Sequence, residues 1–229
     1  MKERIKIDST ILSFLVILTG FLYLFPSFYA TGAFWDQVFD VIGFFSVMIG
    51  VYLRMVARGH KKVHSQEGQG LVTSGPYRHM RNPMYLGSFL LGCGYIFLVW
   101  PWWLLPVFIW LFYLRFRRQI IIEEDHLQEL FKQEYEKYTR RVPRLFPDLK
   151  KLDAATVRRD FPWKEAWLTK ERNGMWAWPI FGFAMELIQE KVIFGYFHMQ
   201  QTLAEFLLAV IIFEILLWVF YRKDKTKDQ

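Results

Sequence analysis

The chain has 229 residues, of which 53% are hydrophobic, 19% aromatic and only 22% charged, and its formal net charge is +7. So much apolar surface excludes a disordered chain, and a single cysteine excludes a disulfide scaffold, an iron–sulfur cluster bound by this chain alone and a cysteine-rich zinc site. The length suits one soluble domain or about six membrane spans.

Long apolar segments follow one another along the chain. Residues 11–30 carry no charge, and residues 39–56 carry charges only near their ends. Residues 84–114 form an uncharged run, too long for one straight span at about 1.5 Å per residue. Because its middle reads Trp-Pro-Trp-Trp, we expect two spans, 84–99 and 103–114, joined by a tight aromatic turn at the membrane interface.

Two further apolar segments, 175–197 and 203–221, complete the pattern. The first of them contains charged residues and could instead be a tilted or interfacial helix. The sequence therefore predicts an all-α, polytopic integral membrane bundle of about six transmembrane helices, with the long loops forming a pocket on one side.

The positions of the basic residues predict the orientation of this bundle. If all six segments cross, 28 of the 29 Lys and Arg residues fall on one side when charges at span ends are counted with the nearer loop, and Lys191 is the exception. This positive-inside pattern predicts that both termini and the long loops are cytoplasmic. Because sorting across the membrane accounts for the basic excess, we expect no nucleic-acid partner. The first apolar run lacks a small-residue cleavage site, so we expect no cleavable signal peptide.

The loop after the second span is rich in glycine, which lets the backbone approach a ligand closely. Gly75-Pro76 predicts a turn, and Asn82-Pro83 predicts a helix start with Asn82 as its cap. His60 and His64 are one helical turn apart, a spacing that permits metal binding. The sequence offers no third ligand beside them, so we expect a juxtamembrane surface and no metal. A simple connector between spans is the alternative for the whole loop.

After the fourth span, the sequence predicts an amphipathic helix that leaves the membrane and ends before Pro143. One face carries apolar and aromatic side chains: Leu127, Leu130, Phe131, Tyr135 and Tyr138. The helix also carries charged side chains near the membrane: Arg115, Arg117, Arg118, Glu123 and Glu124. A surface helix with a solvated charged face would account for the same residues.

Together, the two segments resemble the isoprenylcysteine carboxyl methyltransferase family and its phospholipid methyltransferase relatives. The family's first motif, L-V-T-x-G-x-Y-x-x-x-R-[HN]-P-x-Y, is matched by Leu71, Val72, Thr73, Gly75, Tyr77, Arg81, Asn82, Pro83 and Tyr85. The second motif is matched by Glu123, Glu124, Leu127, Phe131, Tyr135, Tyr138, Val142 and Pro143. The resemblance covers about residues 50–147.

This resemblance implies an integral membrane enzyme that binds S-adenosyl-L-methionine in a cytoplasmic pocket and takes a lipid-like substrate from the bilayer. The residues that it assigns to the cofactor pocket are Leu71, Val72, Gly75, Tyr77, Arg81, Asn82, Pro83, Tyr85 and Glu124. It also implies that Glu123 assists Glu124 and that Arg117 or Arg118 faces the methyl acceptor.

Two departures from the family pattern leave the acceptor open. Asn82 and Gln69 stand where the carboxyl methyltransferases commonly have histidine, so neither position can carry a proton. A carboxylate acceptor is ionised at pH 7 and needs only a cation to hold it, whereas an amine must first lose a proton to a base. The arginine pair favours a lipid-like carboxylate, isoprenoid or prenylcysteine-like; the glutamate pair permits a lipid amine as the alternative.

We expect residues 1–149 to form the methyltransferase core and residues 150–229 to add about two helices to the same bundle. Ionisable groups within spans are costly and often functional, and four glutamates fall in the last two segments: Glu186, Glu190, Glu205 and Glu214. We interpret them as carboxylates that fasten the last two helices together, with Glu190 and Lys191 as neighbours. They also support a non-enzymatic transporter or assembly factor, while a sterol-reductase-like protein is a third alternative for which the chain is short.

Overall fold

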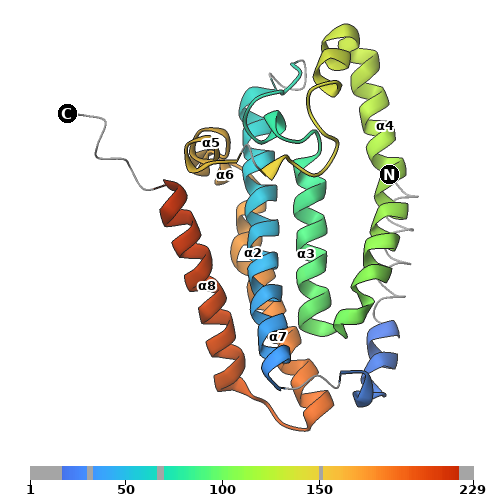
Figure 1. The fold of residues 1–229 in the computed structure, drawn as a ribbon, viewed down its shortest axis with the longest axis vertical. Helices are drawn as coiled ribbons and strands as arrows, with labels where there is room; N and C mark the ends of the chain where they lie inside the picture. The colour runs from blue at the N-terminus through green and yellow to red at the C-terminus, as the bar shows by residue number, and fades with distance from the viewer. Residues whose placement is uncertain (1–16, 30–32, 66–69, 150–151, 222–229) are drawn as a thin grey trace, which may run out of the picture.

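The computed structural model describes residues 17–29, 33–65, 70–149 and 152–221, and the regular elements in these ranges are all helices. Five long helices run lengthwise through the molecule (Figure 1): α2 (Ala33–His64), α3 (Pro83–Val99), α4 (Leu105–Thr139), α7 (Gly174–Phe194) and α8 (Met199–Tyr221). The short helices are η1 (Pro26–Tyr29), η3 (Gly75–Arg78), η4 (Trp102–Leu104), α5 (Ala154–Asp160), α6 (Trp163–Ala166) and η6 (Lys170–Asn173).

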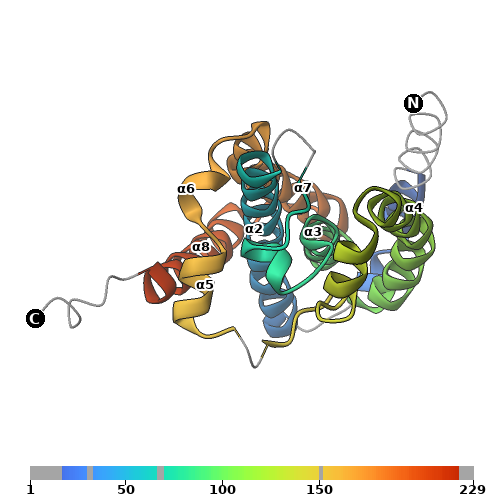
Figure 2. The same ribbon diagram turned by 90° about the horizontal axis from the view of Figure 1, so that it is seen from above.

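Helix α2 lies at the centre of the bundle, with α3, α7 and α8 around it and α4 outside α3 (Figure 2). Its fully buried side chains include Phe44 and Met55, which share one core cluster with Leu98 of α3 and Phe213 of α8. Helices α2 and α3 approach so closely that a Cβ on Gly50 would lie 2.6 Å from a carbonyl oxygen of α3. Small residues at a helix crossing permit this approach.

The predicted apolar segments after residue 33 coincide with helices wherever the structure describes them, and the tight turn between α3 and α4 is confirmed. Among the described residues, two helices are long and apolar enough to cross a membrane, Phe34–His64 and Met199–Val219. The segment 11–30 lies partly outside the described residues. Its described part is not one helix, because residues 17–23 are helical and a separate 3-10 helix starts at Pro26.

Helix α4 contains both the predicted fourth span and the predicted amphipathic helix that leaves it. It continues without a break past residue 114, because the charged residues there extend the same helical pattern. The interruption comes later, at Lys132, whose φ of +43° is rare for a residue with a side chain. The last turns of α4 are thereby redirected at the upper end of the bundle (Figure 1).

A segment of the C-terminal part, residues 153–173, lies at the same end of the bundle as the loop 70–82. Three of its acidic residues bind basic residues of the preceding part of the chain. These contacts join Asp160 to His79 (2.8 Å), Glu165 to His60 (2.7 Å) and Glu171 to Arg54 (3.2 Å). The segment is therefore held by side-chain contacts to α2 and to the turn after η3.

At the opposite end, Glu190 joins α7 to α8. Its carboxylate accepts hydrogen bonds from the Thr202 hydroxyl and from the backbone N–H of His198, both at 3.0 Å. Lys191, which we expected as a neighbour of these carboxylates, donates to the carbonyl oxygen of Gly195 at 2.7 Å. Of the other three glutamates, Glu186 and Glu205 are buried, and Glu214 lies on an exposed face of α8.

Candidate functional site

A cavity of about 280 Å³ opens where the loop 70–82 and the start of α3 meet α4. Both sequence motifs line it. From the predicted site come Leu71, Val72, Tyr77, Arg81, Asn82, Pro83, Tyr85, Glu123 and Glu124. The other walls are formed by Lys61, Ser65, Gly70, Met84, His126, Leu127, Leu130, Phe131, Tyr135 and Tyr138. We call this space the motif cavity.

Gly75 is the one predicted pocket residue that does not line the motif cavity. It is the first residue of η3 and has a φ of +59°, a conformation that glycine adopts without strain. A Cβ there would also lie 2.5 Å from Nε2 of His60. Gly75 therefore permits the backbone turn at the start of η3 and the close packing against His60, but it does not line the cavity.

Glu124 is the most constrained carboxylate of the motif cavity, with only 8% of its surface exposed. Arg144 donates to it from Nε (3.1 Å) and from Nη2 (2.9 Å), and Asn82 donates from Nδ2 (3.0 Å). A second guanidinium, that of Arg81, lies 3.6 Å away. With two cations and an amide around it, the Glu124 carboxylate is satisfied by the protein itself.

Helix α3 starts at Pro83 with Asn82 at the N-cap position, as predicted, but the Asn82 side chain does not cap the helix. Its φ of −127° and ψ of 58° differ from the extended conformation of a capping residue, and its side chain makes no cap hydrogen bond. The amide instead donates to Glu124 and to the carbonyl oxygen of Arg144. Asn82 thus connects the start of α3 to both α4 and the chain after it.

Glu123 has a different environment from its neighbour Glu124. It is exposed, and it accepts hydrogen bonds of 2.8 Å from the Tyr85 hydroxyl and from Nε2 of Gln119. No cation lies within ion-pair distance of it among the residues that the structure describes. Of the two glutamates, Glu123 is the one whose negative charge remains open to a ligand.

Three tyrosines form the aromatic wall of the motif cavity. The Tyr138 hydroxyl donates to the carbonyl oxygen of Tyr77 at 2.6 Å, which ties the end of α4 to η3. Burial raises the pKa of Tyr77 and of Tyr138. Burial, reinforced by the negative charge of Glu124, raises the pKa of Tyr135 to about 12. All three hydroxyls are therefore protonated at neutral pH and can donate hydrogen bonds.

Two of the donors in these walls lack a partner. The Tyr135 hydroxyl and Nε of Arg81 are both buried, and neither has a hydrogen-bond acceptor within the described part of the chain. Buried polar groups are normally paired, so an unpaired donor in a cavity wall calls for an explanation, such as a bound ligand.

A second cavity, of about 290 Å³, lies between α4 and the chain segment that follows it. We call it the aromatic cavity, because its walls are mostly apolar and aromatic: Phe89, Ile109, Phe112, Tyr113, Phe116, Ile120, Leu145 and Phe146. Its two cations are Arg117 and Arg144. Because Arg144 also binds Glu124, this ion pair separates the aromatic cavity from the motif cavity.

Arg117 and Arg118, which the sequence could not separate, differ in position. Arg117 lines the aromatic cavity and lies over the Tyr113 ring, 5.6 Å from its centroid. Arg118 is exposed and lines neither cavity. A third, apolar cavity of about 480 Å³ shares Phe112 and Phe116 with the aromatic cavity. Apolar space therefore extends along α4 toward the turn at the opposite end.

Sequence reasoning missed Arg144 altogether. Leu127, Phe131, Tyr135 and Tyr138 were predicted as motif residues but not as residues of the pocket. Their spacing of three or four residues put them on one helical face, which was the available signal. The one sequence signal for Arg144 was that it directly follows Pro143, the last residue of the second motif.

Known proteins match the region that builds this site. Residues 36–134 match the family model described as phospholipid methyltransferase. The protein-S-isoprenylcysteine O-methyltransferase of Saccharomyces cerevisiae is 33% identical over 110 residues, which cover 44% of this chain and 46% of that protein. Its namesake in Schizosaccharomyces pombe is 31% identical over 134 residues, covering 54% of this chain and 55% of that protein.

The chain thus spans about half the length of the curated relatives it matches. No solved structure matches it. The family match contains the whole first motif and the first four of the eight matched residues of the second, and the two segments meet in the motif cavity. The part of the chain that builds the motif cavity is therefore similar to the phospholipid methyltransferase family and to two protein-S-isoprenylcysteine O-methyltransferases.

Proposed function

We propose that the protein is an integral membrane methyltransferase that uses S-adenosyl-L-methionine and methylates the carboxylate of a lipid-like molecule. The observation that carries this proposal is the pair of adjoining cavities. One contains charges of both signs among apolar and aromatic side chains, the other is aromatic with two arginines, and the Glu124–Arg144 pair lies between them.

The motif cavity suits S-adenosyl-L-methionine by its chemistry. The unpaired donors of Arg81 and Tyr135 match the acceptors of a carboxylate or a ribose. Glu123 offers a negative charge to an ammonium or sulfonium group, and the aromatic wall with Phe131 offers a surface for a purine. When bound, this cofactor supplies a methyl group that its positively charged sulfur has already activated.

The aromatic cavity suits a lipid-like acceptor that ends in a carboxylate. Phenylalanine rings offer apolar surface to a chain entering from the bilayer, and Arg117 and Arg144 offer two cations to its charged end. A carboxylate is ionised at pH 7, so no base is required. The remaining tasks are to align the acceptor oxygen for in-line attack and to keep water out.

The state of Glu124 favours a carboxylate over an amine acceptor. An amine arrives protonated and needs a base. Glu124 is neutralised by Arg144 and Arg81 and has no free oxygen to serve as that base. Glu123 remains the candidate base for the alternative, lipid-amine N-methylation.

For the membrane arrangement we propose six spans with the motif cavity on the cytoplasmic side. The loop 70–82 and the segment 153–173 lie at one end of the bundle, and the short connections from α3 to α4 and from α7 to α8 lie at the other (Figure 1). This separation agrees with the distribution of Lys and Arg along the sequence.

The test offers labelled cofactor to the purified protein together with a farnesylated cysteine derivative or a membrane-lipid extract. A base-labile product is expected, because a methyl ester hydrolyses in base and an N-methyl group does not. The neighbouring arginines provide a matched pair: Arg117→Ala should raise KM for the acceptor at least about tenfold, since it removes a charge-assisted contact, and Arg118→Ala should not. A base-stable product would favour the amine alternative, and no product with any lipid would contradict the proposal.

A further inference from the structure

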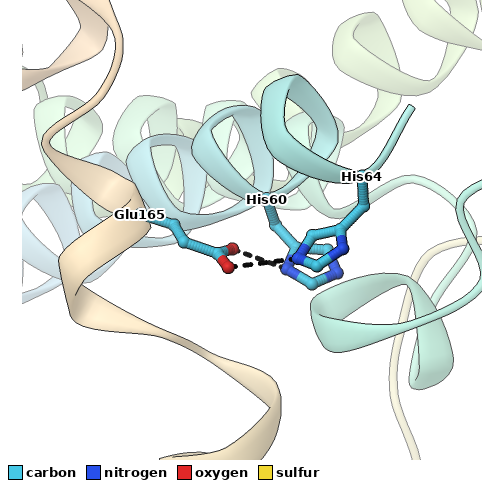
Figure 3. Close-up of side chains that lie close together, drawn as sticks. All are labelled: His60, His64 and Glu165. Carbon is cyan, nitrogen blue, oxygen red and sulfur yellow. Dashed lines mark hydrogen bonds and ion pairs between the residues drawn. The ribbon is translucent and has the colours of Figure 1, made fainter. Parts of the chain in front are cut away.

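Two histidines of α2 and a glutamate of α6 meet at the end of the bundle that carries the loop 70–82. Figure 3 shows the rings of His60 and His64 side by side, with the Glu165 carboxylate reaching them from α6. Nδ1 of His60 lies 2.7 Å from Oε2 of Glu165, and Nε2 of His64 lies 3.1 Å from Oε1. One donor atom from each residue lies within 4.8 Å of the other two.

These three side chains have the chemistry of a metal site. Two histidines at positions i and i+4 point from one helical face to the same point, and two imidazoles with one carboxylate are a known zinc ligand set. In a tetrahedral site with bonds of about 2.0–2.2 Å, ligand atoms lie roughly 3.3–3.6 Å apart. The two nitrogen–oxygen distances, 2.7 and 3.1 Å, are shorter than this, and all three ligand atoms lie within 4.8 Å of one another, so side-chain movements of about 1 Å would bring them to the tetrahedral spacing.

The burial of the three ligands leaves a route for an ion and for a fourth ligand. The His60 side chain is only 7% exposed, while those of Glu165 and His64 are 22% and 42% exposed. The cluster is thus anchored on its inner side and open to solvent on its outer side. Water can complete the coordination, as in zinc sites that have three protein ligands.

The inner histidine is held by a further contact. Nε2 of His60 lies 2.9 Å from the Ser74 hydroxyl, at the start of the Gly75 turn. When Nδ1 binds a metal, the imidazole proton resides on Nε2 and is donated to Ser74. A metal-binding histidine normally has such a partner on its other nitrogen, which fixes the ring.

We propose that His60, His64 and Glu165 bind one divalent transition-metal ion of the zinc type. The ion joins α2 to the segment 153–173, which lies beyond the region of the family match. It acts as a structural link and does not take part in methyl transfer. The proposal therefore stands independently of the proposed function. It differs from the expectation of no metal, because the third candidate ligand lies 101 residues after His64 and is brought there only by the fold.

The test measures Zn²⁺ binding to the full chain in detergent, after removal of any affinity tag and treatment with a chelator. One Zn²⁺ per chain is expected, and Co²⁺ in its place should give the intense visible absorption of a four-coordinate site. His64→Ala and Glu165→Gln should each lower the affinity at least about tenfold, because each removes one of three protein ligands. His198→Ala is the matched control, since His198 also lies beside a glutamate, Glu190, but at the other end of the bundle.

Folding is checked independently by thermal unfolding, because an ion that binds only the folded state raises Tm. Zn²⁺ should raise the Tm of the wild type and of His198→Ala, and it should do so much less in the two ligand variants. Glu165→Gln retains the shape of the side chain and serves if His64→Ala fails to fold. Absence of stoichiometric binding by the wild type, or equal binding by both ligand variants, would overturn the proposal.

Discussion

Replacing Glu124 by glutamine tests how the motif cavity is held together. The change keeps the volume of the side chain but removes its charge. It puts an amide where the guanidinium of Arg144 makes two hydrogen bonds, of 2.9 and 3.1 Å. One bond can survive, because Oε1 can still accept from Asn82.

The magnitude follows from the contacts that are lost. A hydrogen bond to a charged group contributes roughly 1.5–3 kcal/mol, and two are lost here. Because the Arg144 side chain is 52% exposed, part of this is recovered by solvation, and we expect a loss of about 2–4 kcal/mol. For a chain of this size that lowers Tm by roughly 5–15 °C.

The assay is thermal unfolding in detergent, followed by the fluorescence of the ten tryptophans. Glu123→Gln is the matched control, because Glu123 is exposed and accepts only from Tyr85 and Gln119. It should change stability by less than about 1 kcal/mol. Equal Tm values for the two variants would refute the structural role of Glu124. A loss of stability also means that inactivity of a Glu124 variant cannot by itself identify a catalytic residue.

Three other predictions concern packing, the aromatic wall and pH. Gly50→Ala should destabilise the protein by about 1–3 kcal/mol in an unfolding titration, because its Cβ meets the α3 backbone, whereas Gly20→Ala, with open space around it, should not. Tyr138→Phe leaves a buried carbonyl of η3 unpaired, so the free energy of unfolding measured by urea titration should fall by about 1–3 kcal/mol. Burial opposes ionisation of Asp160, but the hydrogen bonds from Arg159 and His79 outweigh this effect and lower the pKa of the carboxyl group. Ionised Asp160 therefore stabilises the fold above about pH 4, and this stabilisation is lost as the pH falls further. Protease cleavage within residues 153–173 should therefore rise only below about pH 4, and cleavage that is independent of pH would contradict this.

The helices were largely predictable from the sequence, because apolar runs and their charged borders mark them directly. The break in α4 was not, since nothing local distinguishes Lys132 from its helical neighbours. The break within the described residues 17–29 was also not predicted, although Pro26 marks the start of the separate 3-10 helix. Helix existence is a local property, whereas the direction of a helix end depends on what it packs against.

The same distinction applies to the site. The motif residues were predictable because each motif is continuous in sequence and matches a known pattern. The roles of individual side chains depend on contacts across the chain. The Asn82 amide binds Glu124 instead of capping α3, and Glu124 is held by an arginine that the motifs do not contain. His60 and His64 were predicted to lack a third metal ligand because Glu165, which contacts His60, lies on a helix far away in the sequence.

The central claim, that the motif cavity binds S-adenosyl-L-methionine, is tested most directly by calorimetric titration of the purified protein with S-adenosylhomocysteine. The wild type should bind one molecule per chain. Tyr135→Phe removes a hydroxyl that has no partner within the described residues, so it should leave Tm unchanged while weakening binding about five- to tenfold. Folded wild-type protein that binds no S-adenosylhomocysteine, or a Tyr135→Phe variant that binds it as tightly as the wild type, would contradict the account.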